Sequence, residues 1–188
     1  MSVSSAASFG FTNTDIDVGC RLVEALVRRA SEGAQPIGHA SLLELARGLH
    51  PRDAMLGREV PVGIGMKLTF VAGFCRANGF PDLASLAVAE GDGRNDQQDQ
   101  RRAVAAFDWS QVEERLVGYA ATMRASVPRN QKPRKERPAD VAWYAYFCSH
   151  REACAKLDGE DKKEIINLLM AGLDPDTALR RLMAAKAG

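Results

Sequence analysis

Residues 57–89 read GREVPVGIGMKLTFVAGFCRANGFPDLASLAVA, and this stretch decides the fold that the sequence predicts. Its first nine residues include Pro61 and three glycines, which disfavour a helix, so we expect a regular helix to begin only near Gly65. Gly79 supplies the C-terminal stop that commonly ends a helix. Between these two glycines, apolar side chains recur at helical spacing, at Met66, Phe70, Phe74 and Ala77.

Two more helices are expected before this stretch. Residues 1–13 are mostly small and polar, and they predict a flexible arm. Thr14 and Asp17 are spaced as a capping box, and apolar residues follow about every four positions, so a helix is expected from about residue 14. A short extended segment over residues 34–39 then leads to a second helix, which Ser41 is expected to cap.

The pattern changes after the third helix. Phe80-Pro81-Asp82 predicts a turn, and residues 83–89 predict a strand. Residues 90–102 are polar and contain glycine, which is typical of a long loop. Residues 103–107 predict a second strand, so the two strands and their loop are expected to form a β-hairpin.

The C-terminal third begins with a helix that Ser110 and Glu113 are expected to open as a capping box. Residues 124–137, here called the basic segment, hold six basic side chains, one acidic side chain and two of the chain's eight prolines. Such a composition predicts an extended linker. Three helices are expected after it, over residues 139–157, 160–171 and 175–186. The expected organisation is an arm over 1–13, a domain over 14–125, a linker over 126–138 and a small helical domain over 139–188.

The predicted element order is that of a winged helix-turn-helix domain, in which a third helix can enter the major groove of DNA and a hairpin wing contacts the flanking backbone. The expected fold class is α+β, mainly α, with a C-terminal helical segment. The chain also resembles the DNA-binding domain of alkylguanine-DNA alkyltransferases over roughly residues 14–107. The matching motifs are Gln35-Pro36-Ile37 before a helix with Leu45-Ala46, Arg58-x-Val60 with Gly63-x-Gly65-Met66, and Asn78-x-Phe80-Pro81.

The sequence departs from that family at its reactive residue. Ala84 stands where the family has the alkyl-accepting Cys, and Ser85 stands where its next His is found. Alkyl transfer needs a thiolate nucleophile, so the resemblance implies only the scaffold, as in non-catalytic alkyltransferase-like proteins. No other catalytic motif is present in a defensible form, and we expect neither an enzyme nor a cofactor.

Charge is distributed unevenly along the chain. The protein has 25 basic and 24 acidic residues, which excludes a uniformly basic nucleic-acid coat. Residues 1–89 hold eight basic and eight acidic residues, so the positive charge is concentrated in the basic segment.

Hydrophobic residues make up 46% of the chain, which excludes wholesale disorder. No apolar run is long enough to span a bilayer and no signal peptide is recognisable, so a soluble, cytoplasmic protein without membrane contact is expected.

Arginine and lysine side chains of the expected third helix, wing and linker are the candidate DNA contacts, because cations that displace counterions from phosphates supply sequence-independent affinity. These candidates are Arg58, Lys67, Arg94, Arg101, Arg102, Arg129, Lys132, Arg134, Lys135 and Arg137. The alternative is that each of these side chains is an ordinary solvent-exposed cation and that the basic segment is only a linker.

The run Trp143-Tyr144-Ala145-Tyr146-Phe147 places four aromatic residues within five positions, more than one helix face can hold. Docking inside the protein is the favoured explanation, and Trp143, Tyr144, Tyr146 and Phe147 as a protein-binding patch is the alternative. Cys148, His150 and Cys154 do not share a helix face and lack a fourth ligand, so no zinc site is expected.

The leading functional expectation is a non-catalytic DNA-binding protein, such as a bacterial regulator or accessory factor. The skew of 18 Arg to 7 Lys is typical of GC-rich bacterial genomes. The alternative is a small protein-binding inhibitor or adaptor, for example a plasmid- or phage-borne protein acting on host or conjugation machinery.

Overall fold

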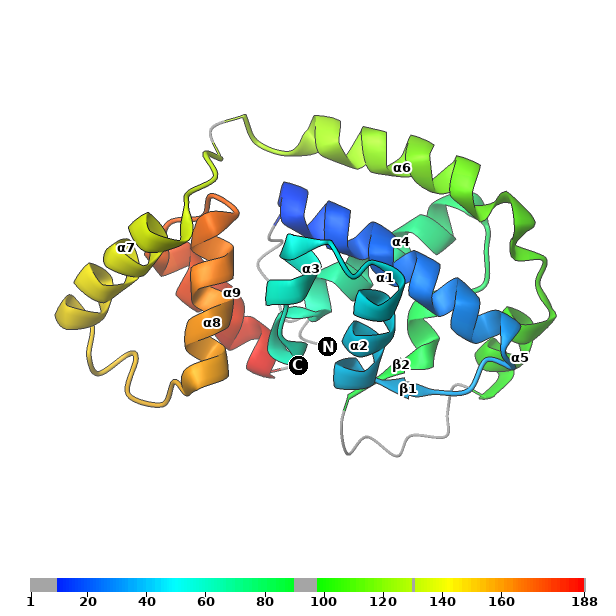
Figure 1. Ribbon diagram of the computed structural model, residues 1–188, viewed down its shortest axis with the longest axis horizontal. Helices are drawn as coiled ribbons and strands as arrows, with labels where there is room; N and C mark the ends of the chain where they lie inside the picture. Colours follow the sequence, from blue (N-terminus) through cyan, green and yellow to red (C-terminus); the bar gives the residue numbers. More distant parts are fainter. Residues whose placement is uncertain (1–9, 90–97, 130, 188) are drawn as a thin grey trace, which may run out of the picture.

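The computed structural model describes residues 10–89, 98–129 and 131–187, and it shows a mainly helical α+β protein (Figure 1). Short 3₁₀ turns interrupt the chain at η1 (Pro61–Gly63), η2 (Leu83–Leu86) and η3 (Trp109–Gln111). The helices and strands are α1 (Asn13–Ser31), β1 (Ile37–Gly38), α2 (His39–Leu49), α3 (Ala54–Arg58), α4 (Gly65–Asn78), β2 (Ala87–Val88), α5 (Gln98–Ala106), α6 (Val112–Ser126), α7 (Glu136–Ser149), α8 (Gly159–Met170) and α9 (Pro175–Ala187).

Helix α1 begins at Asn13, close to the predicted start, but its capping box lies two residues earlier than predicted. Its capping box is formed by Thr12 and Asp15, in which Asp15 N donates to Thr12 Oγ1 over 3.1 Å and Thr12 N donates to Asp15 Oδ2 over 2.8 Å. The spacing of three residues is the one expected for Thr14 and Asp17, but the residues that form the box lie two positions earlier in the sequence. The shift places Asp15, which is 1% exposed, in the first turn of the helix.

Helix α1 is the central helix of the N-terminal body, which comprises residues 10–89 and 98–126, and α4 packs closely against it. A Cβ atom on Gly19 would overlap the ring of Phe70, so glycine at this position permits the close approach of the two helices. Phe70 and Phe74 are fully buried, and Tyr119 of α6 packs on both rings with centroid distances of 5.2 and 5.7 Å. The expected start of α4 at Gly65 and its stop at Gly79, where φ is 67°, are confirmed.

The predicted β-hairpin is wrong. Residues 103–107 were expected to form its second strand, but they lie in and just after α5, where Val104 is buried and its carbonyl accepts a 3.0 Å hydrogen bond from Trp109 Nε1. A short alanine-rich apolar run suits a helix as well as a strand. Within the described residues, β2 instead pairs in parallel with β1, through Ile37 and Ala87, and no strand forms a wing. Residues 90–97 of the expected loop lie outside the described residues.

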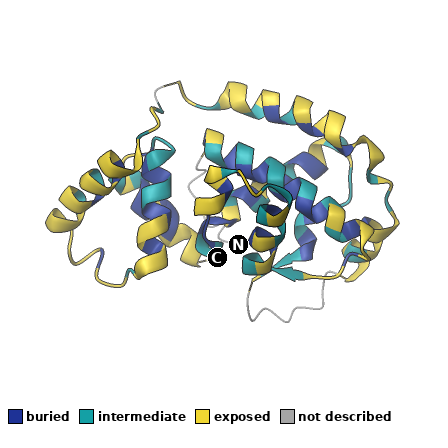
Figure 2. Cartoon of the chain, in the orientation of Figure 1, coloured by how far each residue is buried: buried dark blue, intermediate teal, exposed yellow. Residues whose placement is uncertain are grey.

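A second apolar core lies in the C-terminal body, which comprises α7, α8 and α9 (Figure 2). The expected ranges of α8 and α9 are confirmed to within one residue, whereas α7 begins at Glu136, inside the expected linker, and ends at Ser149 instead of residue 157. The side chain of Val62 in η1 packs against this second core, so η1 links the two bodies. The buried members of the core are Ala139, Trp143, Cys154, Ile165, Leu168, Leu169, Leu173, Ala178, Leu179 and Leu182.

The contact at η1 yields a stability prediction. A Cβ atom on Gly63 would overlap the buried carboxylate of Glu164 on α8, so Gly63→Ala is expected to destabilise the protein by about 1–3 kcal/mol through overpacking. Gly65→Ala is the matched control, because no atom lies within 4 Å of its Cβ position. Urea denaturation measures both free energies of unfolding, and equal stabilities for the two variants would contradict the packing described here.

Candidate nucleic-acid interface

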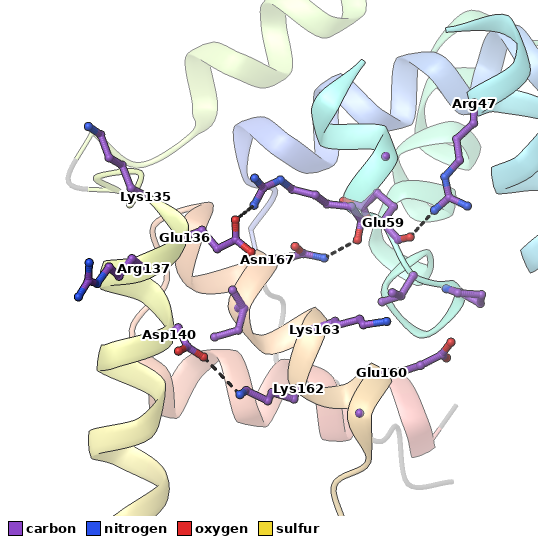
Figure 3. Close-up of a pocket in the computed structure, with 16 residues that line it drawn as sticks. Arg47, Glu59, Lys135, Glu136, Arg137, Asp140, Glu160, Lys162, Lys163 and Asn167 are labelled. Carbon is purple, nitrogen blue, oxygen red and sulfur yellow. Dashed lines mark hydrogen bonds and ion pairs between the residues drawn. The ribbon is translucent and has the colours of Figure 1, made fainter. Parts of the chain in front are cut away.

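A groove of about 1520 Å³ runs between the two bodies (Figure 3). One wall is formed by residues 57–61, together with Arg47 of α2, and the other by the N-terminal parts of α7 and α8. Its charged lining consists of six cations and four carboxylates, which are Arg47, Arg58, Lys135, Arg137, Lys162, Lys163, Glu59, Glu136, Asp140 and Glu160. The lining is therefore a cationic surface with acidic side chains distributed within it.

Arg58, a predicted DNA contact, lies in this groove but is engaged within the protein. Its Nη1 atom lies 3.0 Å from Glu136 Oε2, and its carbonyl oxygen accepts a 3.0 Å hydrogen bond from Asn167 Nδ2. These contacts join the N-terminal body to both α7 and α8. Arg58 thus connects the two walls of the groove, and its charge is offset by Glu136.

Among the other cations of the groove, Lys162 and Arg47 have partners within the protein, whereas Lys163 has none among the described residues. Lys162 pairs with Asp140 over 3.3 Å, and Arg47 donates to the carbonyl oxygen of Glu59 over 2.5 Å, which fixes the chain before η1. Lys163 extends across the groove without an ion pair to any described residue (Figure 3). Lys163 is therefore a cation of the groove interior that is available to an anionic ligand.

The basic segment is seated on the C-terminal body through Arg134. Its backbone N–H donates to Met170 O over 3.0 Å, and its Nη1 donates to Leu173 O over 2.6 Å. These bonds satisfy carbonyl groups at and beyond the C-terminal end of α8, where a cation is also favoured by the helix dipole. The close fit continues at Gly172, where φ is 104° and a Cβ atom would lie 3.1 Å from the backbone of Gln131. Arg134, a predicted DNA contact, is therefore half-buried and engaged within the protein.

Four cations of the basic segment are exposed and make no hydrogen bond or ion pair to any described residue. They are Arg129, Lys132, Lys135 and Arg137. Figure 3 shows Lys135 and Arg137 projecting from the start of α7 toward solvent and away from the groove interior. Of the four, Lys135 and Arg137 line the groove, and the seating of the adjacent Arg134 holds these two unpaired cations at its rim.

Lys67 is also a predicted DNA contact, and it lies on the helix that was expected to enter the major groove. It is 2% exposed and cannot reach a phosphate. Its Nζ donates to Gly63 O over 3.0 Å and lies 2.9 Å from Glu59 Oε2, 3.6 Å from Asp15 Oδ1 and 4.0 Å from Glu164 Oε1. A cation this deep is stable only when it is paired. The prediction for Lys67 is wrong because the fold surrounds it with carboxylates.

Arg181 of α9 completes this buried charge cluster, which consists of Asp15, Glu59, Lys67, Glu164 and Arg181. Its Nη2 donates to Asp15 Oδ1 over 2.7 Å. The five residues are each at most 5% exposed, and they come from both bodies. Three carboxylates therefore face two cations, one negative charge in excess when all five are ionised.

Burial and neighbouring charges shift the pKa values in this cluster in different directions. Burial raises the pKa of Glu164 to about 7, against the attraction of Lys67, and it raises the pKa of Glu59 as well. For Asp15, burial is outweighed by Lys67 and by the bond from Arg181, so its pKa is lowered. For Lys67, burial is outweighed by the three carboxylates, so its pKa is raised. Among the carboxylates of the cluster, Glu164 is thus the one whose pKa lies near neutral pH.

The cations expected on the wing do not form one surface with the basic segment. Arg101 Nε donates to Ser85 O over 3.4 Å and joins α5 to η2. Arg102 is exposed and lies 3.6 Å from Asp99 one turn away. Arg94 lies outside the described residues. Without the hairpin, the roles expected for these arginines lose their structural basis.

The aromatic run divides between core and surface. Trp143 is 4% exposed in the C-terminal core and stacks on Tyr146, with a centroid distance of 5.8 Å. Tyr144 is 68% exposed and Phe147 is 37% exposed. Internal docking, the favoured explanation, therefore applies to Trp143 and Tyr146, and only Tyr144 and Phe147 present apolar surface.

Three further features were sought among the described residues: a metal site, a reactive cysteine and a membrane-spanning helix. None of their His, Cys, Asp and Glu side chains gather into a group suited to a metal ion. Burial raises the pKa of the Cys20 and Cys75 thiols to about 11, so both remain protonated and poorly nucleophilic. Among these residues, no helix combines the length and apolar character that crossing a membrane requires.

The seating of the basic segment yields a second stability prediction. Arg134→Ala removes the hydrogen bond to Leu173 O and leaves helix-end carbonyls unsatisfied, so a loss of about 1–3 kcal/mol is expected. Lys135→Ala, one residue away and without a partner, is expected to change stability by less than about 0.5 kcal/mol. Thermal and urea unfolding compare the two, and a Lys135 variant as unstable as the Arg134 variant would refute this division of roles.

No protein-family model matches the chain, and neither a curated protein nor a solved structure matches it. The assignment of function therefore rests on the geometry of this chain alone. That geometry offers a cationic rim, a groove between two bodies and a buried charge cluster that joins those bodies.

Proposed function

We propose that this protein binds DNA without catalysis, through the unpaired cations of the basic segment and the adjoining groove. The observation that carries the proposal is the contrast within the segment. Arg134 is used to hold the chain in place, whereas Arg129, Lys132, Lys135 and Arg137 are exposed and unpaired. Exposed cations on a segment that is anchored at Arg134 suit a phosphate backbone, because each contact releases condensed counterions.

The acidic residues near this rim are compatible with a phosphate ligand. Glu136 is offset by Arg58, and Asp140 is offset by Lys162, so two of the nearby carboxylates are already paired. Lys163 adds a positive charge inside the groove. The proposal does not use a recognition helix or a wing, because Lys67 is buried and α5 replaces the second strand. It therefore concerns backbone binding, to which base-specific contacts contribute little.

The test is a variant with Arg129, Lys132, Lys135 and Arg137 all changed to Gln. Affinity for duplex DNA is measured by fluorescence anisotropy over a series of salt concentrations. For the wild type, log Kd is expected to rise steeply with log salt, and the variant is expected to lower that slope by about 3–4, since each phosphate contact contributes about 0.9.

A charge-matched control separates this surface from net charge. Arg52, Arg76, Arg115 and Lys156 are exposed and outside the basic segment, and changing all four to Gln removes the same number of charges. This control is expected to keep most of the wild-type slope. Absence of DNA binding by the wild type at low salt, or equal losses in the two variants, would refute the proposal.

A second candidate function is protein binding, as an inhibitor or adaptor, through the outer face of α7. One observation favours it: Val141 and Tyr144 are 61% and 68% exposed, and at a spacing of three residues they share a helix face with Cys148, which is also exposed. An exposed tyrosine beside aliphatic surface is typical of interface anchors. This face lies opposite the one that carries Trp143.

The two candidates are separated by purification from the native host with and without nuclease. A protein partner that binds α7 is expected to remain after nuclease treatment and to be lost from Tyr144→Ser, whose folding should be unchanged because the side chain is exposed. Trp143→Phe serves as the core control. Retention of the partner by Tyr144→Ser, or its loss on nuclease treatment alone, would count against the α7 surface.

A further inference from the structure

The buried charge cluster lies where the two bodies meet. Asp15, Glu59 and Lys67 belong to the N-terminal body, and Glu164 and Arg181 belong to α8 and α9. Within the cluster, the contacts that cross the junction include the 2.7 Å bond from Arg181 to Asp15 and the 4.0 Å approach of Lys67 to Glu164. Separation of the bodies would break the contacts of Glu164 and Arg181 with Lys67 and Asp15.

The cluster is not balanced when it is fully ionised. Its three carboxylates exceed its two cations by one charge, and an unpaired charge in a buried site is costly. Three of its buried atoms, Glu59 Oε2, Glu164 Oε2 and Arg181 Nη1, have no hydrogen-bond partner among the described residues. Of these, Glu59 Oε2 is compensated by the Lys67 ammonium group, which lies 2.9 Å away. A proton on one carboxylate would remove the excess charge.

Glu164 is the carboxylate best placed to take that proton. Lys67 Nζ lies 4.0 Å from it but 2.9 Å from Glu59, and Arg181 bonds to Asp15. The charged groups that face Glu164 are Lys67 from α4, Arg181 from α9, Asp15 from α1 and Glu59 from the chain before η1. Gly63, which has no side chain, leaves the space that the Glu164 carboxylate occupies.

We infer that docking of the C-terminal body onto the N-terminal body takes up a proton at this cluster, so that the groove is held together at mildly acidic pH and loosens as the pH rises. The groove is affected because its two walls belong to different bodies, joined also by Arg58. The consequence for DNA binding rests on the proposed function, whereas the docking step does not.

The direction of the effect follows from proton linkage. Burial raises the pKa of Glu164 from its ordinary 4.5 to about 7 in the docked protein. Between these values only the docked form holds the proton, so docking weakens as the pH rises through this interval. Asp15, with its lowered pKa, acts only at more acidic pH, and Lys67, with its raised pKa, acts only at more alkaline pH. Burial also raises the pKa of Glu59, so any proton that Glu59 takes up on docking changes the docking constant in the same direction as Glu164. From about pH 5.5 to about pH 8.5, the docking constant is expected to fall about thirtyfold.

Amide hydrogen exchange tests the pH dependence of docking in the absence of DNA. Protection of α9, corrected for the intrinsic pH dependence of exchange, is expected to fall about thirtyfold over that pH range in the wild type. Glu164→Gln keeps the shape of the side chain without its charge and is expected to remove the pH dependence. Glu160→Gln, an exposed position on the same helix, is the control and is expected to behave as the wild type. A pH-independent wild type, or an unchanged dependence in Glu164→Gln, would overturn the inference.

A second measurement does not depend on a variant that folds. Carbon NMR of the wild-type Glu164 carboxyl group is expected to give a midpoint near 7, and a midpoint near 4.5 would overturn the inference. DNA affinity at about pH 8.5 then tests the groove: Glu164→Gln is expected to bind more tightly than the wild type. Equal affinities would refute control of the groove by the proton while leaving DNA binding itself intact.

Discussion

The buried ammonium group of Lys67 is the constraint on which the arrangement of this protein depends. It lies 2.9 Å from Glu59 and within 4.0 Å of Asp15 and Glu164, so helices that are distant in the sequence must meet around it. A buried cation is tolerated only when its partners are in place, so the position of the C-terminal body is tied to the electrostatics of the N-terminal one. The apolar contact of Val62 alone would leave that position less specific.

The same junction organises the surface. Arg58 reaches from the N-terminal body to Glu136, and Arg134 anchors the basic segment on the end of α8. Both were expected to contact DNA, and both are instead used to position the chain. Their role fixes the backbone that carries the neighbouring exposed cations, so one set of basic residues orders the segment and another remains available to a ligand.

Local features of the fold were predictable from the sequence, whereas long-range ones were not. The start of α4, its stop at Gly79 and the last two helices followed from glycine, proline and apolar spacing. Residues 103–107 were misassigned because a short alanine-rich run fits either element. The capping box was misplaced by two residues, and the correct frame, Thr12 with Asp15, would have marked the first member of the charge cluster. Its pairing with Arg181, 166 residues away, had no local signal.

The division of the charge cluster between two bodies constrains which substitutions the protein can tolerate during evolution. A substitution at Arg181 or Glu164 changes what Lys67 and Asp15 must accommodate in the other half of the chain. Charge changes on the two sides must therefore occur together, and a C-terminal half exchanged from a diverged relative would fit only if its acids and bases matched. The two bodies have separate apolar cores, yet they are bound to evolve as one unit.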